Sequence, residues 1–255
     1  RDGYLADLPA VTPETLTAAY RGMLSAAQID VICLGADEAA VRAALLEKLA
    51  GTERAPAELP GNLFLPGQPA QRFEERMDLV QAKLCMMFTW NAPADPEDLN
   101  AFRLAMCLYG GGATSRLFLN VREKQSLCYY CGSRFASATA CMMVDSGVEP
   151  GNTEKAEQAI LKELDDLVNG PIQPEELEDA RRSLLSGLNS VGDSLAGLEN
   201  WYYTEILRGA GVHAPGEAAS ALAEVTAEDV RRLLAGFTHS VSYLVTAKEG
   251  APHAE

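Results

Sequence analysis

The sequence predicts an α+β fold, because strand patterns and helix patterns are grouped in separate runs along the chain. Two neighbouring segments, 127–135 and 139–148, have the composition of strands and together predict a hairpin. They are followed by two segments with apolar residues at helical spacing, 153–168 and 174–198. The chain has 255 residues, of which 47% are hydrophobic, and this is enough to build a substantial core.

The N-terminal segment is predicted to form a helix, a strand and a second helix. Thr12 is a residue type that caps helices, Pro13 suits the first helical position, and apolar residues follow on one face. Residues 29–34 are short and β-branched, which predicts a strand. Apolar residues recur at helical spacing over 41–49. Residues 51–70 then contain four prolines and three glycines with little periodicity, which is typical of an interdomain linker.

From residue 71 the pattern is that of one complete domain. We expect a strand over 75–90, a helix over 96–109, a glycine break and a second helical segment over 115–124. Glycines at 187, 192 and 197 are expected to kink or interrupt the long helical segment 174–198. The chain closes with a predicted helix over 227–234 and a strand over 240–246.

The closing pattern resembles the opening one. Residues 11–34 and 225–245 share the order of cap, helix and strand, and have similar lengths. We therefore interpret 1–50 as the C-terminal tail of a preceding domain that is mostly absent, 51–70 as the linker, and 71–255 as the complete domain. The missing initiator Met also indicates that the chain is cut from something longer. An orphaned strand at 29–34 would have to pack on this domain or on another chain.

Composition and charge argue against several classes of protein. The formal charge is −15 and the pI is about 4.6, with Lys and Arg dispersed, so we expect no binding to nucleic acid. No apolar run approaches the ~20 residues that span a bilayer, and the first residues do not resemble a signal peptide. We therefore expect no membrane association and a soluble, cytoplasmic protein.

Six cysteines are few for this length, and most lie in apolar segments, which is typical of buried free thiols. Cys128 and Cys131 have the spacing of a redox pair or of half a zinc site. In a regular strand, however, residues three apart point to opposite faces. No second pair of this kind and no nearby His completes a set of zinc ligands. We therefore interpret both residues as structural thiols.

Three other chemistries are not favoured. The run 110–112 of three glycines could cradle a phosphate, but it follows a helix and lacks the Gly-Lys-Ser/Thr of a phosphate loop, so a sharp turn between helices is the better interpretation. The histidines, at 213, 239 and 253, are too far apart for an H-x-x-E-H zinc motif. A serine nucleophile within G-x-S-x-G is also absent from the sequence.

Arg122 and Tyr129 stand seven residues apart across a predicted helix-to-strand junction. A guanidinium and a phenol can both donate hydrogen bonds to a carbonyl oxygen, or to the charge that develops on it during attack on an amide. Arg122 has an alternative role as a cation at a helix C-terminus. Tyr129 and Tyr130 should face opposite ways on the strand, one in the core and one toward solvent or ligand. Arg116, at a helix start, is expected to pair with a carboxylate.

The segment 115–129, S-R-L-F-L-N-V-R-E-K-Q-S-L-C-Y, resembles the signature of the second half of the M16 zinc metallopeptidases, which include the insulinase, pitrilysin and mitochondrial processing peptidase groups. The resemblance extends over nearly all of 71–247, and 1–50 resembles the end of the family's first half. It implies an α+β domain with a mostly antiparallel sheet and helices packed on one face. The strand at 81–84, Q-A-K-L, also resembles that of bacterial partner subunits of this family.

In this family two similar halves face each other around a chamber. One half binds zinc, and the other contributes an Arg and a Tyr that contact the substrate. The resemblance implies that these residues are Arg122 and Tyr129, and that they hold the scissile carbonyl and stabilise the oxyanion. This chain lacks the zinc motif, so we expect no cofactor in it, zinc on a partner half, and no activity alone.

The expected partners are a peptide substrate and a zinc-bearing M16 half or subunit, in a homo- or heterodimer. Two other functions stay open. The chain could be a non-proteolytic scaffold or assembly subunit of the M16 type, or an acidic α+β ligand-binding module unrelated to proteolysis. Whether the whole protein is an enzyme depends on whether a zinc motif lies upstream.

Overall fold

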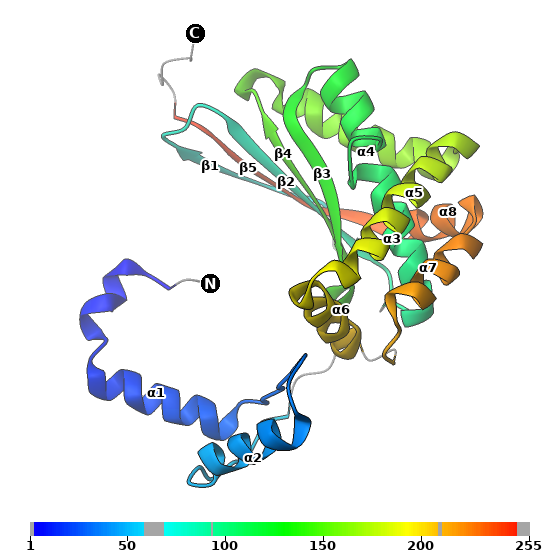
Figure 1. Ribbon diagram of the computed structural model, residues 1–255. Helices are drawn as coiled ribbons and strands as arrows, with labels where there is room; N and C mark the ends of the chain where they lie inside the picture. Colours follow the sequence, from blue (N-terminus) through cyan, green and yellow to red (C-terminus); the bar gives the residue numbers. More distant parts are fainter. Residues whose placement is uncertain (1–2, 59–68, 93, 209–210, 249–255) are drawn as a thin grey trace. The chain divides into compact units, whose positions relative to one another are not determined.

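The computed structural model describes residues 3–58, 69–92, 94–208 and 211–248 (Figure 1). The chain divides into two compact units, Arg1–Gly61 and Asn62–Glu255. Half of the predicted linker at 51–70, residues 59–68, lies outside the described residues. No helix in the described ranges combines the length and the apolar character needed to cross a membrane.

The first unit consists of a 3-10 helix, η1 (Leu5–Ala10), and two α-helices, α1 (Pro13–Ala26) and α2 (Glu38–Leu49). Thr12 caps α1 as predicted, in a reciprocal capping box with Thr15. The strand predicted at 29–34 is not formed. A strand exists only through hydrogen bonds to a neighbour, and no neighbouring strand is described in this unit.

The described residues of the first unit bury no side chain fully. On α1, Leu16, Tyr20 and Met23 are 61%, 57% and 53% exposed, although they lie on one face of the helix. Apolar residues at this spacing normally form the buried face of an amphipathic helix. The unit therefore presents an uncovered apolar face.

The second unit is built on a five-stranded sheet with the strand order β1-β5-β2-β4-β3. Its strands are β1 (Gln71–Met77), β2 (Ala82–Trp90), β3 (Cys128–Ala136), β4 (Cys141–Val148) and β5 (Phe237–Ala247). Only β1 and β5 pair in parallel, so the sheet is mostly antiparallel. The prediction of one strand over 75–90 was wrong, because residues 78–81 break it and β5 lies between the two pieces. A single strand of that length would also be unusually long.

The α-helices of this unit, α3 to α8, lie on one side of the sheet, as Figure 1 shows. The helices are η2 (Pro96–Asp98), α3 (Leu99–Gly110), η3 (Leu117–Lys124), η4 (Ser137–Thr139), η5 (Pro150–Asn152), α4 (Thr153–Asn169), α5 (Pro174–Ser190), η6 (Val191–Asp193), α6 (Leu195–Arg208), α7 (Pro215–Glu224) and α8 (Ala227–Ala235). The interruption predicted for 174–198 is confirmed at η6, which contains Gly192. The fold is therefore the predicted α+β arrangement.

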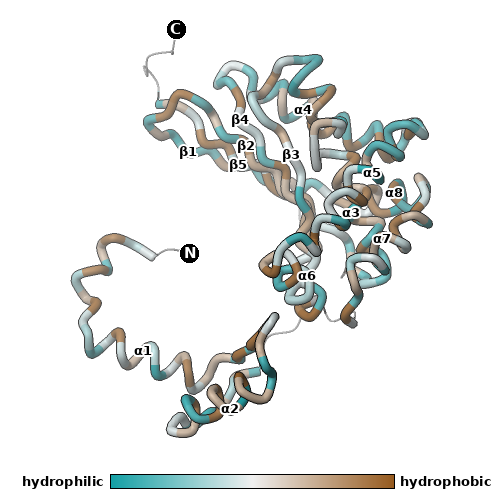
Figure 2. Tube along the Cα trace, viewed as in Figure 1, coloured by the Kyte–Doolittle hydropathy of each residue, from teal (hydrophilic) through white to brown (hydrophobic). Residues whose placement is uncertain are grey.

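Burial alternates along β2, which separates a buried face from a more open one, and hydrophobic residues predominate along this strand (Figure 2). On β2, Ala82, Leu84, Met86 and Phe88 are at most 1% exposed and face the helices. Gly110 ends α3 against β3, where a Cβ atom would lie 2.6 Å from the backbone nitrogen of Ser133. The absence of a side chain therefore lets α3 approach β3 closely. This contact fixes the point from which the segment 111–124 leaves α3.

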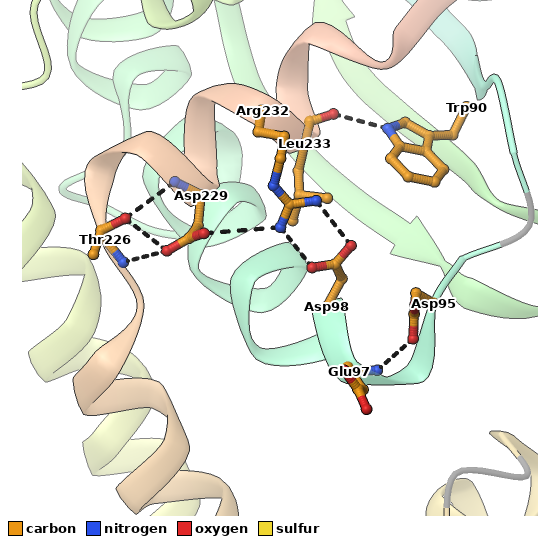
Figure 3. A network of polar contacts seen from close by, with 8 residues as sticks. All are labelled: Trp90, Asp95, Glu97, Asp98, Thr226, Asp229, Arg232 and Leu233. Atoms are coloured by element: carbon orange, nitrogen blue, oxygen red, sulfur yellow. Dashed lines mark hydrogen bonds and ion pairs between the residues drawn. The ribbon is translucent and has the colours of Figure 1, made fainter.

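The closing helix α8 is fixed by polar contacts at both ends (Figure 3). Thr226 caps it in a reciprocal box with Asp229, as the sequence predicts by analogy with Thr12. Arg232 donates to both carboxylate oxygens of Asp98, at 2.6 and 3.0 Å. The indole of Trp90 donates to the carbonyl of Leu233 at 2.9 Å. These contacts join α8 to β2 and to the start of α3.

Candidate functional site

The helix that carries Arg122 is a π-helix, not an α-helix. The amide of Gln125 donates to the carbonyl of Asn120 at 3.2 Å, a bond that spans five residues. Such turns contain one residue more than an α-helical turn and occur frequently at functional sites. The glycine run 110–112 ends α3 and begins the turn toward this helix, so its interpretation as a turn between helices is confirmed.

A left-handed residue links the π-helix to β3. Ser126 has φ = 50°, a conformation that is uncommon outside glycine and that often ends a helix. The amide of Leu127 then donates to the carbonyl of Val121 at 3.1 Å. The chain thus turns sharply from η3 into β3, and Arg122 and Tyr129 lie on the two arms of the turn.

A β-bulge begins β3. Cys128 pairs with Val148 and Tyr130 pairs with Gly147, so Tyr129 is an extra residue without a partner of its own on β4. A bulge shifts the side-chain alternation by one residue. The prediction that Cys128 and Cys131 point to opposite faces was therefore wrong.

Both thiols face the helices, because their partners Val148 and Ser146 are buried on that face. The two tyrosines do not divide between core and solvent either, since Tyr129 is 56% and Tyr130 44% exposed. The sequence did not indicate the bulge, because it depends on the register with β4. Its main effect is to present Tyr129 outward beside Tyr130.

The turn encloses a cavity of about 320 Å³ to which both predicted site residues contribute. It is lined by Arg122, Glu123, Ser126, Leu127, Cys128, Tyr129 and Glu149. The Tyr129 hydroxyl donates to Oε1 of Glu149 at 3.4 Å. Arg122 and Tyr129 are therefore brought together at one cavity, with Glu149 as a third polar group at its edge.

The guanidinium of Arg122 is held on one side and free on another. Its Cζ lies 4.5 Å from the ring centroid of Phe118, one turn earlier on the same helix. Its Nε lies 3.5 Å from a carboxylate oxygen of Glu123. Within the described residues its terminal nitrogens make no hydrogen bond, and 39% of the side chain is exposed. These N–H groups can therefore donate to a ligand in the cavity. The position in the last turn of η3 also suits a helix-capping cation.

The charge of Arg122 affects the cavity wall. The pKa of Cys128 is lowered, first by a hydrogen bond from the Cys131 thiol and also by Arg122, while burial opposes the shift. Glu123 and Glu149 place negative charge at the same rim. The cavity thus contains one fixed cation, two carboxylates and one phenol, which suits polar groups such as the carbonyls of a peptide.

Arg116 has a structural role. It is 8% exposed and donates to the carbonyl of Pro171 at 2.8 Å and to Glu176 at 2.9 Å. Glu176 also accepts from the amide of Gln173, so one carboxylate joins the start of α5 to the start of η3. The predicted carboxylate partner is confirmed. This contact anchors the helix that carries Arg122.

The open face of the sheet continues from the cavity. Tyr130 lies across Gly147, where a Cβ atom would be 2.5 Å from the ring, and the ammonium of Lys83 lies 4.9 Å from the ring centroid. Lys83 also bonds to Gln81. Sequence reasoning missed this cluster and Glu149, although Glu149 directly follows the strand predicted to pair with 127–135.

Among the described residues, no three His, Cys, Asp or Glu side chains are grouped so that they could hold a metal ion. The donors at the cavity, one thiol and two carboxylates at its rim, do not form such a group. The described part of this chain therefore does not fit a zinc centre. Its cavity offers hydrogen-bond donors, namely the guanidinium of Arg122 and the hydroxyl of Tyr129.

A mostly antiparallel sheet with a bulged edge strand and helices on one side defines an α+β domain, and its described residues hold no group of metal ligands. Residues 10–184 match the family described as the peptidase M16 inactive domain. The chain belongs to the M16 family, as an inactive-domain protein.

One relative is named probable inactive metalloprotease YmfF, from Bacillus subtilis (strain 168). The two are 28% identical over 253 residues, covering 98% of this chain and 59% of the relative. A conserved protein from Enterococcus faecalis V583 matches with a TM-score of 0.84 and 24% identity, covering 99% of this chain and 59% of that one. The M16 inactive domain from Pseudomonas fluorescens matches with a TM-score of 0.73 and 22% identity, covering 97% and 60%. This chain thus spans about three fifths of the length of these proteins.

Proposed function

We propose that this chain is the non-zinc half of an M16-type metallopeptidase, which binds an extended peptide and supplies Arg122 and Tyr129 to a zinc site on another half or subunit. The observation that carries the proposal is that both side chains line one cavity, one from each arm of the turn between η3 and β3. Glu123, Ser126 and Glu149 add further polar groups to the lining, which suits a peptide backbone.

In the proposed reaction the partner half supplies a metal-activated water. Arg122 donates from its terminal nitrogens to the scissile carbonyl, and the fixed charge strengthens this contact as the oxygen becomes anionic. Tyr129 donates a second hydrogen bond through its hydroxyl, which in the absence of substrate is directed to Glu149. Stacking on Phe118 and the anchoring of η3 by Arg116 hold the guanidinium in place.

Two features of the first unit support a place for it in a larger, paired assembly. Its apolar helix face is uncovered, and its capped helix resembles the capped α8 that precedes β5. We propose that it is the tail of a preceding M16-like domain, whose sheet would pair with residues 29–34. In such an arrangement the apolar side chains of α1 would become buried, as those of α8 are.

The test is reconstitution with a partner that carries H-x-x-E-H, followed by cleavage of an internally quenched peptide. Arg122→Ala and Tyr129→Phe should each lower turnover by roughly ten- to a thousandfold, the range for losing one oxyanion donor. The partner-binding affinity and the thermal midpoint should not change.

Matched controls come from exposed residues outside the cavity. Arg182, on α5, is paired only loosely with Asp179, at 3.4 Å, and its side chain is 73% exposed. Tyr203, on α6, is 41% exposed. Arg182→Ala and Tyr203→Phe should keep full turnover. Equal turnover in the site variants and the controls would disprove the assignment of Arg122 and Tyr129.

A non-proteolytic scaffold is the second candidate, and the name of the Bacillus relative favours it, since that protein is called a probable inactive metalloprotease. A scaffold predicts a tight complex with the partner and no peptide cleavage under any condition. The retained pair of donors at one cavity favours the peptidase half. A cleavage assay on the purified complex separates the two functions.

A further inference from the structure

The bulge at Tyr129 places two thiols side by side. Cys128 and Cys131 are 9% and 7% exposed, and both face the helical layer. Their partners Val148 and Ser146 are two residues apart on one strand, a separation of about 6.6 Å. Disulfides join Cα atoms about 4.4 to 6.8 Å apart. The two cysteines thus take about the spacing of their partners, at the upper end of this range, whereas a regular strand would set them about 10 Å apart. A disulfide between them therefore requires the backbone of the bulge to contract.

The two thiols differ in access and in acidity. Cys128 contributes to the wall of the cavity that Arg122 and Tyr129 share, whereas Cys131 does not. The pKa of Cys128 is lowered, mainly by the hydrogen bond from Cys131, and the pKa of Cys131 is raised by the same bond and by burial. By contrast, burial and Asp145 raise the pKa of Cys85 to about 11. The more acidic thiol is thus the one that a reagent in the cavity can reach.

We propose that Cys128 and Cys131 are a peroxide-oxidisable dithiol pair whose disulfide displaces Tyr129. The Cys128 thiolate attacks one oxygen of hydrogen peroxide, breaks the O–O bond and becomes a sulfenic acid, and the other oxygen leaves as hydroxide. Cys131 loses its proton and attacks the Cys128 sulfur, which expels a second hydroxide. Both hydroxides leave as water, so two thiols and one peroxide give one disulfide and two waters.

The coupling to Tyr129 follows from its place in the chain. Tyr129 is the unpaired residue between the two cysteines, so a bond of about 2.05 Å between the sulfurs draws the ends of the bulge together and moves this residue. The effect of that movement on catalysis rests on the proposed function, but the disulfide itself does not. Thiol reductants would restore the open form.

The experiment treats the full chain with stoichiometric hydrogen peroxide, alkylates free thiols and analyses tryptic peptides by mass spectrometry. Trypsin cleaves after Lys124 and Arg134, so one peptide, 125–134, contains both cysteines. We expect this peptide to lose two hydrogens, reversibly with dithiothreitol, while Cys141, equally buried on β4, remains alkylated. Amide exchange of the same peptide should also change on oxidation. Full alkylation of 125–134 after treatment, or unchanged exchange in the oxidised form, would overturn the proposal.

Two single-cysteine variants test which thiol is oxidised first. Cys131→Ser should stop at a sulfenic acid on Cys128, which dimedone traps, whereas Cys128→Ser should give no adduct at Cys131. Adducts at Cys131 alone would contradict the assigned order. If either variant fails to fold, the result on the unmodified chain still decides whether the disulfide forms. If the disulfide forms but no complex of the chain cleaves peptide, the proposed function is refuted and the oxidisable pair Cys128 and Cys131 is still established.

Discussion

Gly236 is the position where the structure makes the sharpest prediction about stability. It ends α8 with φ = −77° and ψ = −11°, which alanine adopts without strain. An alanine Cβ would nevertheless overlap the indole of Trp90, at 2.6 Å from Cε2 and 2.7 Å from Cδ1. The ring would have to withdraw, and the hydrogen bond from its nitrogen to Leu233, at 2.9 Å, would be lost (Figure 3).

The expected cost of Gly236→Ala is the sum of two contributions. Overpacking costs about 1 to 3 kcal/mol and a lost hydrogen bond about 0.5 to 1.5 kcal/mol. The free energy of unfolding should therefore fall by about 1.5 to 4.5 kcal/mol. For a unit of this size that lowers the melting temperature by roughly 3 to 18 °C.

The effect of Gly236→Ala on the free energy of unfolding should change sign when the indole is absent. In a Trp90→Leu background no atom occupies the position of the indole nitrogen, so Gly236→Ala should stabilise by about 0.4 to 1 kcal/mol through the unfolded state. Urea unfolding followed by circular dichroism, on all four members of the cycle, measures the coupling. Equal destabilisation by Gly236→Ala in both backgrounds would refute the steric reasoning.

Two further predictions concern the open face of the sheet and the cap of α8. Gly147→Ala should displace the Tyr130 ring and weaken peptide binding by the complex. Thermal stability should change little, because Tyr130 is 44% exposed. Unchanged peptide affinity would show that Tyr130 takes no part in peptide binding. Hydrogen bonds from Thr226, and then Arg232, hold the pKa of Asp229 below its ordinary value of 3.8, so its stabilising effect is present above that pH and is lost as the pH falls through the lower folded value. Below about pH 4, the free energy of unfolding of Asp229→Asn should therefore depend less on pH than that of the unsubstituted chain. An equal pH dependence in both proteins would contradict this.

Local signals predicted the helices well. Thr12 and Thr226 both form the reciprocal caps that their residue types indicate, because a cap involves residues only three apart. The helix α7 was missed, although Pro215 marks its first turn, since it is short and Gly216 obscures the pattern. Long amphipathic helices were found because their periodicity repeats over several turns.

The sheet and the site were predicted less completely. The bulge at Tyr129 depends on the pairing of Tyr130 with Gly147, seventeen residues further along the chain, and one extra residue leaves no trace in local composition. The strand expected at 29–34 did not form because it needs a neighbouring strand, which the described residues of this unit do not supply. Arg122 and Tyr129 were proposed from their motif and line one cavity, whereas Glu149 and Ser126 required the geometry of the turn.

The π-helix and the bulge have a shared consequence for how this segment can vary. Each contains one residue in excess of its regular counterpart, and the two excess residues lie on either side of Ser126. Deleting one residue from η3 would rotate the side chains before it by about 100° relative to β3, and deleting one from the bulge would exchange the faces of the strand. The segment from Leu117 to Cys131 should therefore tolerate many substitutions but no change of length. In related chains, a conserved number of residues between Arg122 and Tyr129 would be a stronger sign of a retained site than conserved neighbours.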